Sequence, residues 1–139
     1  MIIGIGQDIC DANRIAKTID RFGERFKKRI YTKNEIKKCE KRLKSEDSYA
    51  RRFAAKEALS KALGTGFRKG VFYKDIEIVN LPSGKPTIKL YGGALKILKS
   101  ICPSNSLPIV EVSITDDKKL AMAIVIISSK IKEKYWRWV

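Results

Sequence analysis

The sequence predicts a single α+β domain in which a long central helix packs on a mainly antiparallel sheet. The chain has 139 residues, which is enough for one domain with a buried core. Residues 51–66, RRFAAKEALSKALGTG, are rich in alanine, leucine and glutamate and lack proline, as is typical of a strong helix. Segments 75–90 and 108–127 each contain two apolar or alternating runs around a polar turn, which predicts two antiparallel hairpins.

Residues 2–10 are expected to form the first strand, with Ile3, Ile5 and Ile9 on one face. The other face is formed by Gly4, Gly6, Asp8 and Cys10. Two glycines on one face would let another element approach closely. An aspartate in an apolar strand is costly to bury unless it is paired or bound to a metal. Asp8 is therefore either a site residue or one that caps the next helix or faces solvent.

Residues 11–26 are expected to form a helix that begins at an N-cap, Asp11. Its basic face consists of Arg14, Arg21 and Arg25, with Phe22 and Phe26 beside it. Such a face suits docking onto an acidic helical partner, although the phenylalanines would equally suit a core. A further helix is expected from the capping box Thr32-Lys33-Asn34-Glu35 to about Leu43.

The central helix is expected to start near Ser48 and to end at Gly64-Thr65-Gly66. One of its faces is small and apolar, with Ala55, Leu59 and Ala62, and the opposite face carries Phe53, Glu57, Lys61 and Gly64. A carboxylate can bind a hard cation, and a lysine beside a glycine loop with free N–H groups can bind phosphate oxygens. The alternative is a surface pair between Glu57 and Lys61, one turn apart.

The remaining elements are shorter. A loop is expected over 66–73, strands over 75–79 and 85–90, a helix over 92–100, a linker over 103–108, and strands over 108–115 and 120–127. Residues 128–139 are basic and aromatic and are expected to form a tail, so the domain is assigned to residues 1–127.

The composition narrows the possible functions. A net charge of +15 implies an anionic partner, such as nucleic acid, an acidic protein, a phosphorylated small molecule or a membrane surface. The chain has no histidine, which excludes Ser-His-Asp and Cys-His catalysis and histidine zinc sites. Cys10, Cys39 and Cys102 are far apart, which indicates reduced thiols in a cytoplasmic protein. No signal peptide and no apolar run near the ~20 residues that span a bilayer are present.

Several separated motifs together resemble a known family. They are Gly4-Ile5-Gly6-Gln7-Asp8-Ile9, Arg14-Ile15, the segment RFAAKEA at 52–58, Lys61, Gly64-Thr65-Gly66, Asp75-Ile76-Glu77-Ile78, Gly84-Lys85-Pro86 and Val112-Ser113-Ile114-Thr115. In this order and spacing the chain resembles the holo-acyl-carrier-protein synthases, small 4′-phosphopantetheinyl transferases of fatty acid synthesis. The resemblance covers about residues 1–127. It implies the 4′-phosphopantetheinyl transferase fold with one domain per chain, in a homotrimer whose sites lie at subunit boundaries.

The resemblance also implies an activity. The family transfers 4′-phosphopantetheine from coenzyme A to a serine of acyl carrier protein, leaving adenosine 3′,5′-bisphosphate. Asp8 and Glu57 would bind Mg²⁺, which bridges to the diphosphate of coenzyme A, and Lys61 would contact the same phosphates. Glu57 and Lys61 are thus the expected catalytic residues. The acceptor of the serine proton is left open between Glu57 and a metal-bound water.

The other site residues follow from the same resemblance. The expected coenzyme-binding residues are Arg52, Lys61, Gly64, Thr65, Gly66, Lys85 and Pro86. The expected partner-binding residues are Arg14, Arg21 and Arg25, on the helix that docks the acidic carrier protein in relatives. Several relatives have a histidine near the 3′-phosphate where this chain has Asp116. Cations such as Lys118 would then have to replace that contact.

The sequence is also compatible with two other functions. A non-enzymatic nucleic-acid-binding module would explain the charge, but it gives no reason for an aspartate on a glycine-containing strand. A transferase that acts on carrier domains of peptide or polyketide synthases is closer to the expected chemistry. The expectation is therefore an enzyme with coenzyme A and acyl carrier protein as its substrates, without nucleic acid and without a membrane span.

Overall fold

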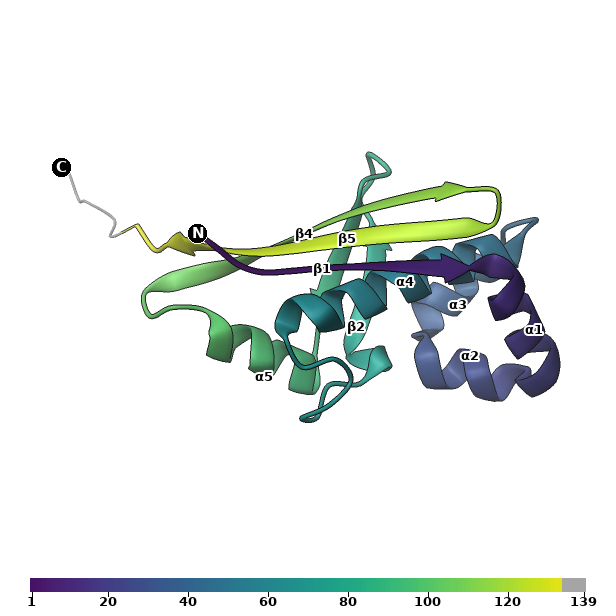
Figure 1. Ribbon diagram of the computed structural model, residues 1–139, viewed down its shortest axis with the longest axis horizontal. Helices are drawn as coiled ribbons and strands as arrows, with labels where there is room; N and C mark the ends of the chain where they lie inside the picture. Colours follow the sequence, from purple (N-terminus) through teal and green to yellow (C-terminus); the bar gives the residue numbers. More distant parts are fainter. Residues whose placement is uncertain (134–139) are drawn as a thin grey trace.

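The computed structural model describes residues 1–133. Its elements, in chain order, are β1 (Ile2–Asp11), α1 (Ala12–Phe22), α2 (Glu24–Ile30), α3 (Lys33–Glu40), α4 (Ser45–Leu63), a 3-10 turn η1 (Tyr73–Asp75), β2 (Ile76–Asn80), β3 (Pro86–Leu90), α5 (Gly92–Ile101), β4 (Ser106–Asp117) and β5 (Leu120–Ile131). The helices lie on one side of the long strands, and α4 runs directly beneath them (Figure 1).

The main sheet has three antiparallel strands in the order β1-β5-β4. Among the strands of residues 1–133, the first therefore pairs with the last, with Gly6 opposite Val125 and Asp8 opposite Ala123. Strands β2 and β3 form a separate two-stranded antiparallel sheet. The α+β class with a central helix on an antiparallel sheet is confirmed.

Helix α4 packs tightly on β1 through the two glycines of the strand. A Cβ atom added at Gly4 would lie 2.1 Å from the carbonyl oxygen of Ala62, and one added at Gly6 would lie 2.0 Å from that of Ala58. Only glycine permits this approach. The apolar side of α4 is fully buried at Ala55 and Leu59, as its helical spacing predicts. The close packing fixes the position of the strand relative to the helix.

The predicted helix ends are largely confirmed. Asp11 caps α1 by accepting a hydrogen bond from the Asn13 N–H at 2.8 Å. Thr32 forms the predicted capping box with Glu35 at the start of α3. Helix α4 ends at Gly64 in the left-handed conformation, with φ of 83°.

Other boundaries differ from the expectations. The helix expected over 11–26 breaks at Gly23, whose positive φ of 57° turns the chain and separates α1 from α2. Helix α3 stops at Glu40, before the expected end, and α4 starts earlier, at Ser45. Strand β5 continues to Ile131, into the segment expected as a tail. The aromatic cluster at 135–139 lies outside the described residues.

The sheet face that is turned away from α4 is apolar and exposed. Its large exposed side chains are Ile5, Ile9, Leu107, Ile109, Leu120, Met122 and Ile124. Large apolar side chains gathered on one exposed face mark an interaction surface. Within residues 1–133, no helix has the length and apolar character that crossing a membrane requires.

Candidate active site

Asp8 and Lys61 form an ion pair at the edge of the main sheet. Lys61 reaches back from α4 and places Nζ 3.0 Å from Oδ1 of Asp8 and 2.9 Å from the carbonyl oxygen of Gln7. The Asp8 side chain is 18% exposed, and the helix cap is supplied by Asp11 instead. The alternatives in which Asp8 caps the helix or faces solvent are therefore wrong. The surface pair of Lys61 with Glu57 is replaced by this cross-element pair.

Glu57 lies one helical turn before Lys61 and has a different partner. The Tyr73 hydroxyl donates a hydrogen bond of 2.7 Å to Oε1 of Glu57. Burial, followed by this hydrogen bond, raises the pKa of Tyr73, so its hydroxyl remains a donor. Burial also raises the pKa of the Cys10 thiol to about 11, and the charges of Asp8 and Glu57 add to that rise. Both carboxylates thus act on the same small region between β1 and α4.

The two carboxylates fit the way proteins bind Mg²⁺. No group of three or more His, Cys, Asp or Glu side chains within residues 1–133 is arranged to hold a metal. Mg²⁺, however, is commonly bound by one or two carboxylates together with substrate phosphates. In the described part of the chain, Oδ2 of Asp8 and Oε2 of Glu57 make no hydrogen bond or ion pair. Each carboxylate therefore keeps one oxygen for a ligand.

The glycine loop after α4 differs from the expectation. The Gly64 N–H donates to the carbonyl oxygen of Lys61 at 3.0 Å, and the Gly66 N–H donates to that of Ser60 at 3.1 Å. The Gly64 bond is the inner bond of a Schellman motif, and the Gly66 bond satisfies a further carbonyl group at the end of the helix. The prediction of free N–H groups is wrong for both glycines. Thr65 lies between them, and its hydroxyl donates to the carbonyl oxygen of Gly66 at 2.8 Å.

The residues predicted to border a nucleotide are only partly brought together. Arg52 and Pro86 line one hollow of about 240 Å³, together with Gly84. Arg52 is 8% exposed and its Nη1 donates to Ser48 Oγ at 2.7 Å, but its buried Nε has no partner among residues 1–133. Lys85 instead pairs with Glu111 at 3.2 Å, with both side chains more than half exposed.

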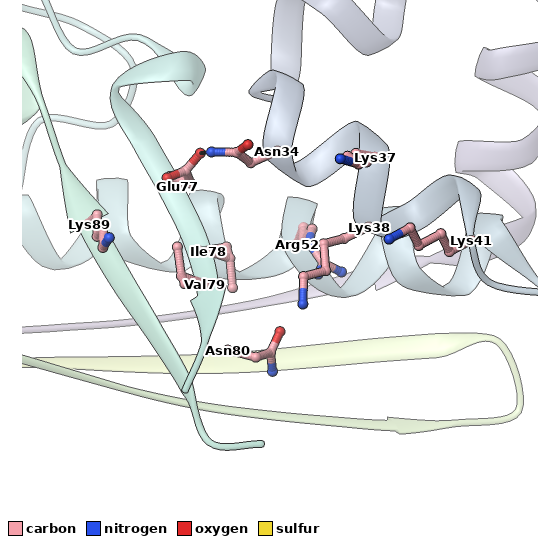
Figure 2. A pocket seen from close by; sticks show the side chains of 10 residues that line it. All are labelled: Asn34, Lys37, Lys38, Lys41, Arg52, Glu77, Ile78, Val79, Asn80 and Lys89. Carbon is pink, nitrogen blue, oxygen red and sulfur yellow. Dashed lines mark hydrogen bonds between the residues drawn. The ribbon is translucent and has the colours of Figure 1, made fainter. Parts of the chain in front are cut away.

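A strongly basic pocket adjoins this hollow at Arg52. It has a volume of about 320 Å³, and side chains from α3, α4, β2 and β3 surround it (Figure 2). Its lysines are Lys37, Lys38, Lys41 and Lys89. None of these lysines pairs with a carboxylate in the described part of the chain. Such a cluster of unpaired cations favours an anionic ligand.

Asp116 does not stand free beside this basic region. The Nη1 atom of Arg51 lies 3.2 Å from Oδ2 of Asp116, which closes an ion pair between α4 and the end of β4. Lys118 lies in the following turn with a positive φ of 47°, and its neighbour Lys119 pairs with Glu46 and Asp47. The pair with Arg51 offsets the negative charge that Asp116 would present to a phosphate.

The three arginines predicted to bind a partner do not share one helix. Arg14 and Arg21 lie on α1, whereas the break at Gly23 places Arg25 on α2. All three are exposed. Arg25 lines a hollow of about 340 Å³ with Thr18, Phe22, Phe26 and Arg29. Phe22 is 49% exposed, whereas Phe26 packs against the core, so the two phenylalanines divide between the two predicted roles.

Sequence reasoning missed Tyr73, the partner of Glu57, and the buried ion pair of Lys56 with Glu35. The Lys56 side chain is fully buried, with Nζ 2.6 Å from Oε1 of Glu35, which is buried as well. Burial lowers the pKa of Lys56, and the charge of Glu35 opposes that change. Lys56 directly precedes Glu57 and lies on the core side of α4. That position in the helix was the one feature of the sequence that could have indicated its burial.

A strand carboxylate, a helix carboxylate and a lysine are the groups that enzymes use when they transfer phosphate-linked groups. The family model "4'-phosphopantetheinyl transferase superfamily" matches residues 4–125. The chain is 52% identical to the holo-[acyl-carrier-protein] synthase of Methylobacterium nodulans over 129 residues, which cover 93% of this chain and 98% of the relative.

Solved structures of relatives have the same fold. The holo-[acyl-carrier-protein] synthase of Neisseria meningitidis is similar with a TM-score of 0.80 and 37% identity, over 92% of this chain and 99% of that one. The Helicobacter pylori synthase, solved in complex with coenzyme A, is similar with a TM-score of 0.76 and 34% identity, over 89% of this chain and 99% of that one. The chain belongs to the holo-[acyl-carrier-protein] synthase family of 4′-phosphopantetheinyl transferases.

Proposed function

We propose that this chain transfers 4′-phosphopantetheine from coenzyme A to a serine of apo acyl carrier protein. The products are holo acyl carrier protein and adenosine 3′,5′-bisphosphate, and the reaction serves fatty acid biosynthesis. One observation carries the proposal: in a chain of this family, Asp8 and Lys61 are paired beside Glu57 at the contact between β1 and α4. The coenzyme A complex of the Helicobacter pylori relative supports the choice of donor.

Asp8 and Glu57 would hold Mg²⁺ through the carboxylate oxygens that lack a protein partner. When bound, the ion would neutralise charge on the diphosphate of coenzyme A. Lys61 would turn from Asp8 to a phosphate oxygen and stabilise the charge on the departing nucleotide. Its side chain is 52% exposed, which leaves it room for that movement.

Arg52 and Pro86 would border the nucleotide half of coenzyme A. The unpartnered Nε of Arg52 supports this role, because a buried charged donor gains a partner when an anion binds. Gly64, Thr65 and Gly66 would shape the loop near the coenzyme, with Thr65 as the member whose N–H is not used by the helix end. Lys85 would have to leave Glu111 before it could bind a phosphate.

Arg14, Arg21 and Arg25 would dock the acyl carrier protein. They are exposed, and Arg25 borders a hollow that also contains the exposed ring of Phe22. A basic surface with an apolar centre complements a small acidic helical protein and speeds their encounter. The docking surface spans α1 and α2 rather than one helix.

The chain would assemble into a homotrimer, the state that its family resemblance leads us to expect. The apolar sheet face supports an assembly, because seven large apolar side chains are exposed there in one chain. An Ile124→Asp substitution places a charge on this face and should shift the molar mass from light scattering towards one chain. A wild-type protein that is already monomeric would rule the trimer out.

Transfer itself is tested with coenzyme A, Mg²⁺ and apo acyl carrier protein, read by intact mass. We expect the mass of one phosphopantetheine on the carrier protein. Asp8→Asn and Glu57→Gln should each slow transfer by at least about 100-fold, because charge stabilisation by the metal is worth several kcal/mol. Asp117→Asn, a matched change at the exposed end of β4, should transfer like the wild type. Full activity in either site variant would overturn the metal assignment.

A further inference from the structure

Tyr73 contacts Glu57 through its hydroxyl and the buried Lys56 through its backbone carbonyl group. We infer that Tyr73 is a positioning residue of the cation site, whose hydroxyl holds one oxygen of the Glu57 carboxylate and leaves the other for the metal. The inference rests on the proposed function, because it takes Glu57 as a metal ligand. It adds a residue that contacts neither the metal nor the substrate and acts through Glu57 alone.

The hydrogen bond itself is specific. The Tyr73 hydroxyl donates to Oε1 of Glu57 at 2.7 Å, and within residues 1–133 it is the only hydrogen bond to that carboxylate. A glutamate side chain has three rotatable bonds, so a carboxylate without such a partner would sample many orientations. Partners of this kind orient metal ligands, and removing them typically weakens metal binding by 10–100-fold.

The Tyr73 ring is held by two other aromatic rings. Its centroid lies 3.6 Å from that of Phe67 at an interplanar angle of 19°, and 5.7 Å from that of Phe53 at 20°. Phe53 lies on α4 one turn before Glu57, whereas Phe67 lies in the loop after the helix. The two stacked neighbours restrict the ring, so its hydroxyl has little freedom to leave Glu57.

The Tyr73 backbone is held by Lys56. The Nζ atom of this buried lysine donates to the carbonyl oxygen of Tyr73 at 3.0 Å and to that of Ile76 at 2.5 Å, and it pairs with Glu35. Glu35 in turn accepts hydrogen bonds from the backbone of Thr32 and Ile78. The neighbours Lys56 and Glu57 therefore hold Tyr73 at both ends, one at its carbonyl group and the other at its hydroxyl.

This arrangement predicts an effect on metal binding rather than on folding. Tyr73→Phe removes the hydroxyl and keeps the ring, so its stacking with Phe53 and Phe67 remains. Tyr91→Phe is the matched control, because its hydroxyl makes only a 3.4 Å contact with Glu77, outside the proposed site. If Tyr73 served only to fill space, Tyr73→Phe would bind metal as the wild type does.

The experiment measures binding of Mn²⁺ by electron paramagnetic resonance, without and with coenzyme A, together with the urea unfolding midpoint. We expect Tyr73→Phe to weaken Mn²⁺ binding about tenfold, with an unfolding midpoint near that of the wild type and the control. The Mg²⁺ concentration that half-saturates transfer should rise by a similar factor. In a Glu57→Gln background, the same substitution should have no further effect on Mn²⁺ affinity, because the hydroxyl acts through Glu57.

Unchanged Mn²⁺ affinity in folded Tyr73→Phe overturns the inference, as does an equal loss in Tyr91→Phe. If Tyr73→Phe does not fold, Phe67→Leu takes its place, since it loosens the ring and leaves the hydroxyl. It should then weaken Mn²⁺ binding, and unchanged affinity would again overturn the inference. A wild type that binds Mn²⁺ but never modifies the carrier protein would refute the proposed reaction and leave this inference standing. A wild type that binds no Mn²⁺ even with coenzyme A present would refute the metal site and the inference together.

Discussion

Lys61 lies 3.0 Å from Oδ1 of Asp8, so the ammonium group occupies one oxygen of a carboxylate that we assign to a cation. The lysine and a divalent ion would therefore share this carboxylate. A bound phosphate would offer the lysine an alternative anionic partner and would release the carboxylate. The pair links the two halves of the proposed site, the metal ligands and the phosphate-binding group.

Lys61→Gln should separate these two roles. We expect transfer to fall about 100-fold, because one preorganised cation is lost at the phosphate. Mn²⁺ affinity of the free protein should stay the same or rise, since the competing ammonium has left Asp8. Intact mass gives the rate and paramagnetic resonance gives the affinity. A tenfold loss of Mn²⁺ affinity would show that Lys61 supports the metal site rather than competing at it.

Gly6→Ala should destabilise the protein strongly. The new Cβ would lie 2.0 Å from the carbonyl oxygen of Ala58, so the strand and α4 would have to move apart. We expect a loss of about 3 kcal/mol or more in the free energy of unfolding, measured in urea at fixed protein concentration. Gln7→Ala, at the next position on the other face, is the control. Equal stability of both variants would contradict the close approach.

Glu35→Gln should leave Lys56 as an unpaired buried charge and cost about 3–5 kcal/mol in the free energy of unfolding. Lys56→Met should cost a similar amount, because it leaves the Glu35 carboxylate as the unpaired buried charge. The double variant should be less destabilised than the sum of the two by at least ~1 kcal/mol, because no lone charge remains. Urea unfolding of the four proteins gives the coupling energy. Strict additivity would mean that the two charges do not interact.

Cys10 should make stability depend on pH in alkaline solution. Its thiol pKa rises from 9.0 to about 11 on folding, mainly through burial. Below about pH 9 the stabilising effect of the buried neutral thiol is fully present. Between pH 9 and 11 the unfolded chain loses this proton while the folded chain keeps it, so the free energy of unfolding falls as pH rises.

The size of that effect is at most roughly 2–3 kcal/mol for a shift of about two pKa units. Comparison with Cys10→Ala isolates it from the other groups that titrate in the same range. Between about pH 8 and about pH 10.5, the free energy of unfolding of the wild type should fall relative to that of Cys10→Ala. A difference that does not change with pH would show that the thiol is not desolvated.

Arg25→Glu should weaken recognition of the carrier protein more than the chemical step. We expect KM for apo acyl carrier protein to rise about tenfold while kcat changes little, because the residue borders the docking hollow and not the carboxylates. The effect should shrink at high salt. Lys96→Glu, an exposed charge reversal on α5, is the matched control. An equal rise in KM for coenzyme A would contradict the docking role.

Local signals account for the parts of the fold that the sequence predicted well. The caps at Asp11 and Thr32 and the end of α4 at Gly64 depend on a few neighbouring residues, whose chemistry is readable along the chain. The glycines of β1 were also readable, because their spacing places them on one face. The break at Gly23 was missed, since one glycine within an apolar and basic pattern does not by itself end a helix.

The missed parts of the site depend on contacts between distant segments. Tyr73 and Glu57 are 16 positions apart, and Lys56 and Glu35 are 21 positions apart. Contacts over such separations produce no periodic pattern in the sequence. A lysine and a glutamate within helical segments read as solvated surface residues. The amides of Gly64 and Gly66 were predicted to be free because their acceptors lie in the backbone of α4, which no side-chain pattern reveals.

Strand β1 carries Asp8, and within residues 1–133 its only strand partner is β5. A nascent polypeptide that leaves the ribosome from its N-terminus thus exposes this segment without a hydrogen-bonded neighbour until residues 120–128 emerge. Closure over so many residues is slow compared with the formation of helices. The strand that carries Asp8 therefore gains its hydrogen-bonded neighbour only after residues 120–128 have been synthesised.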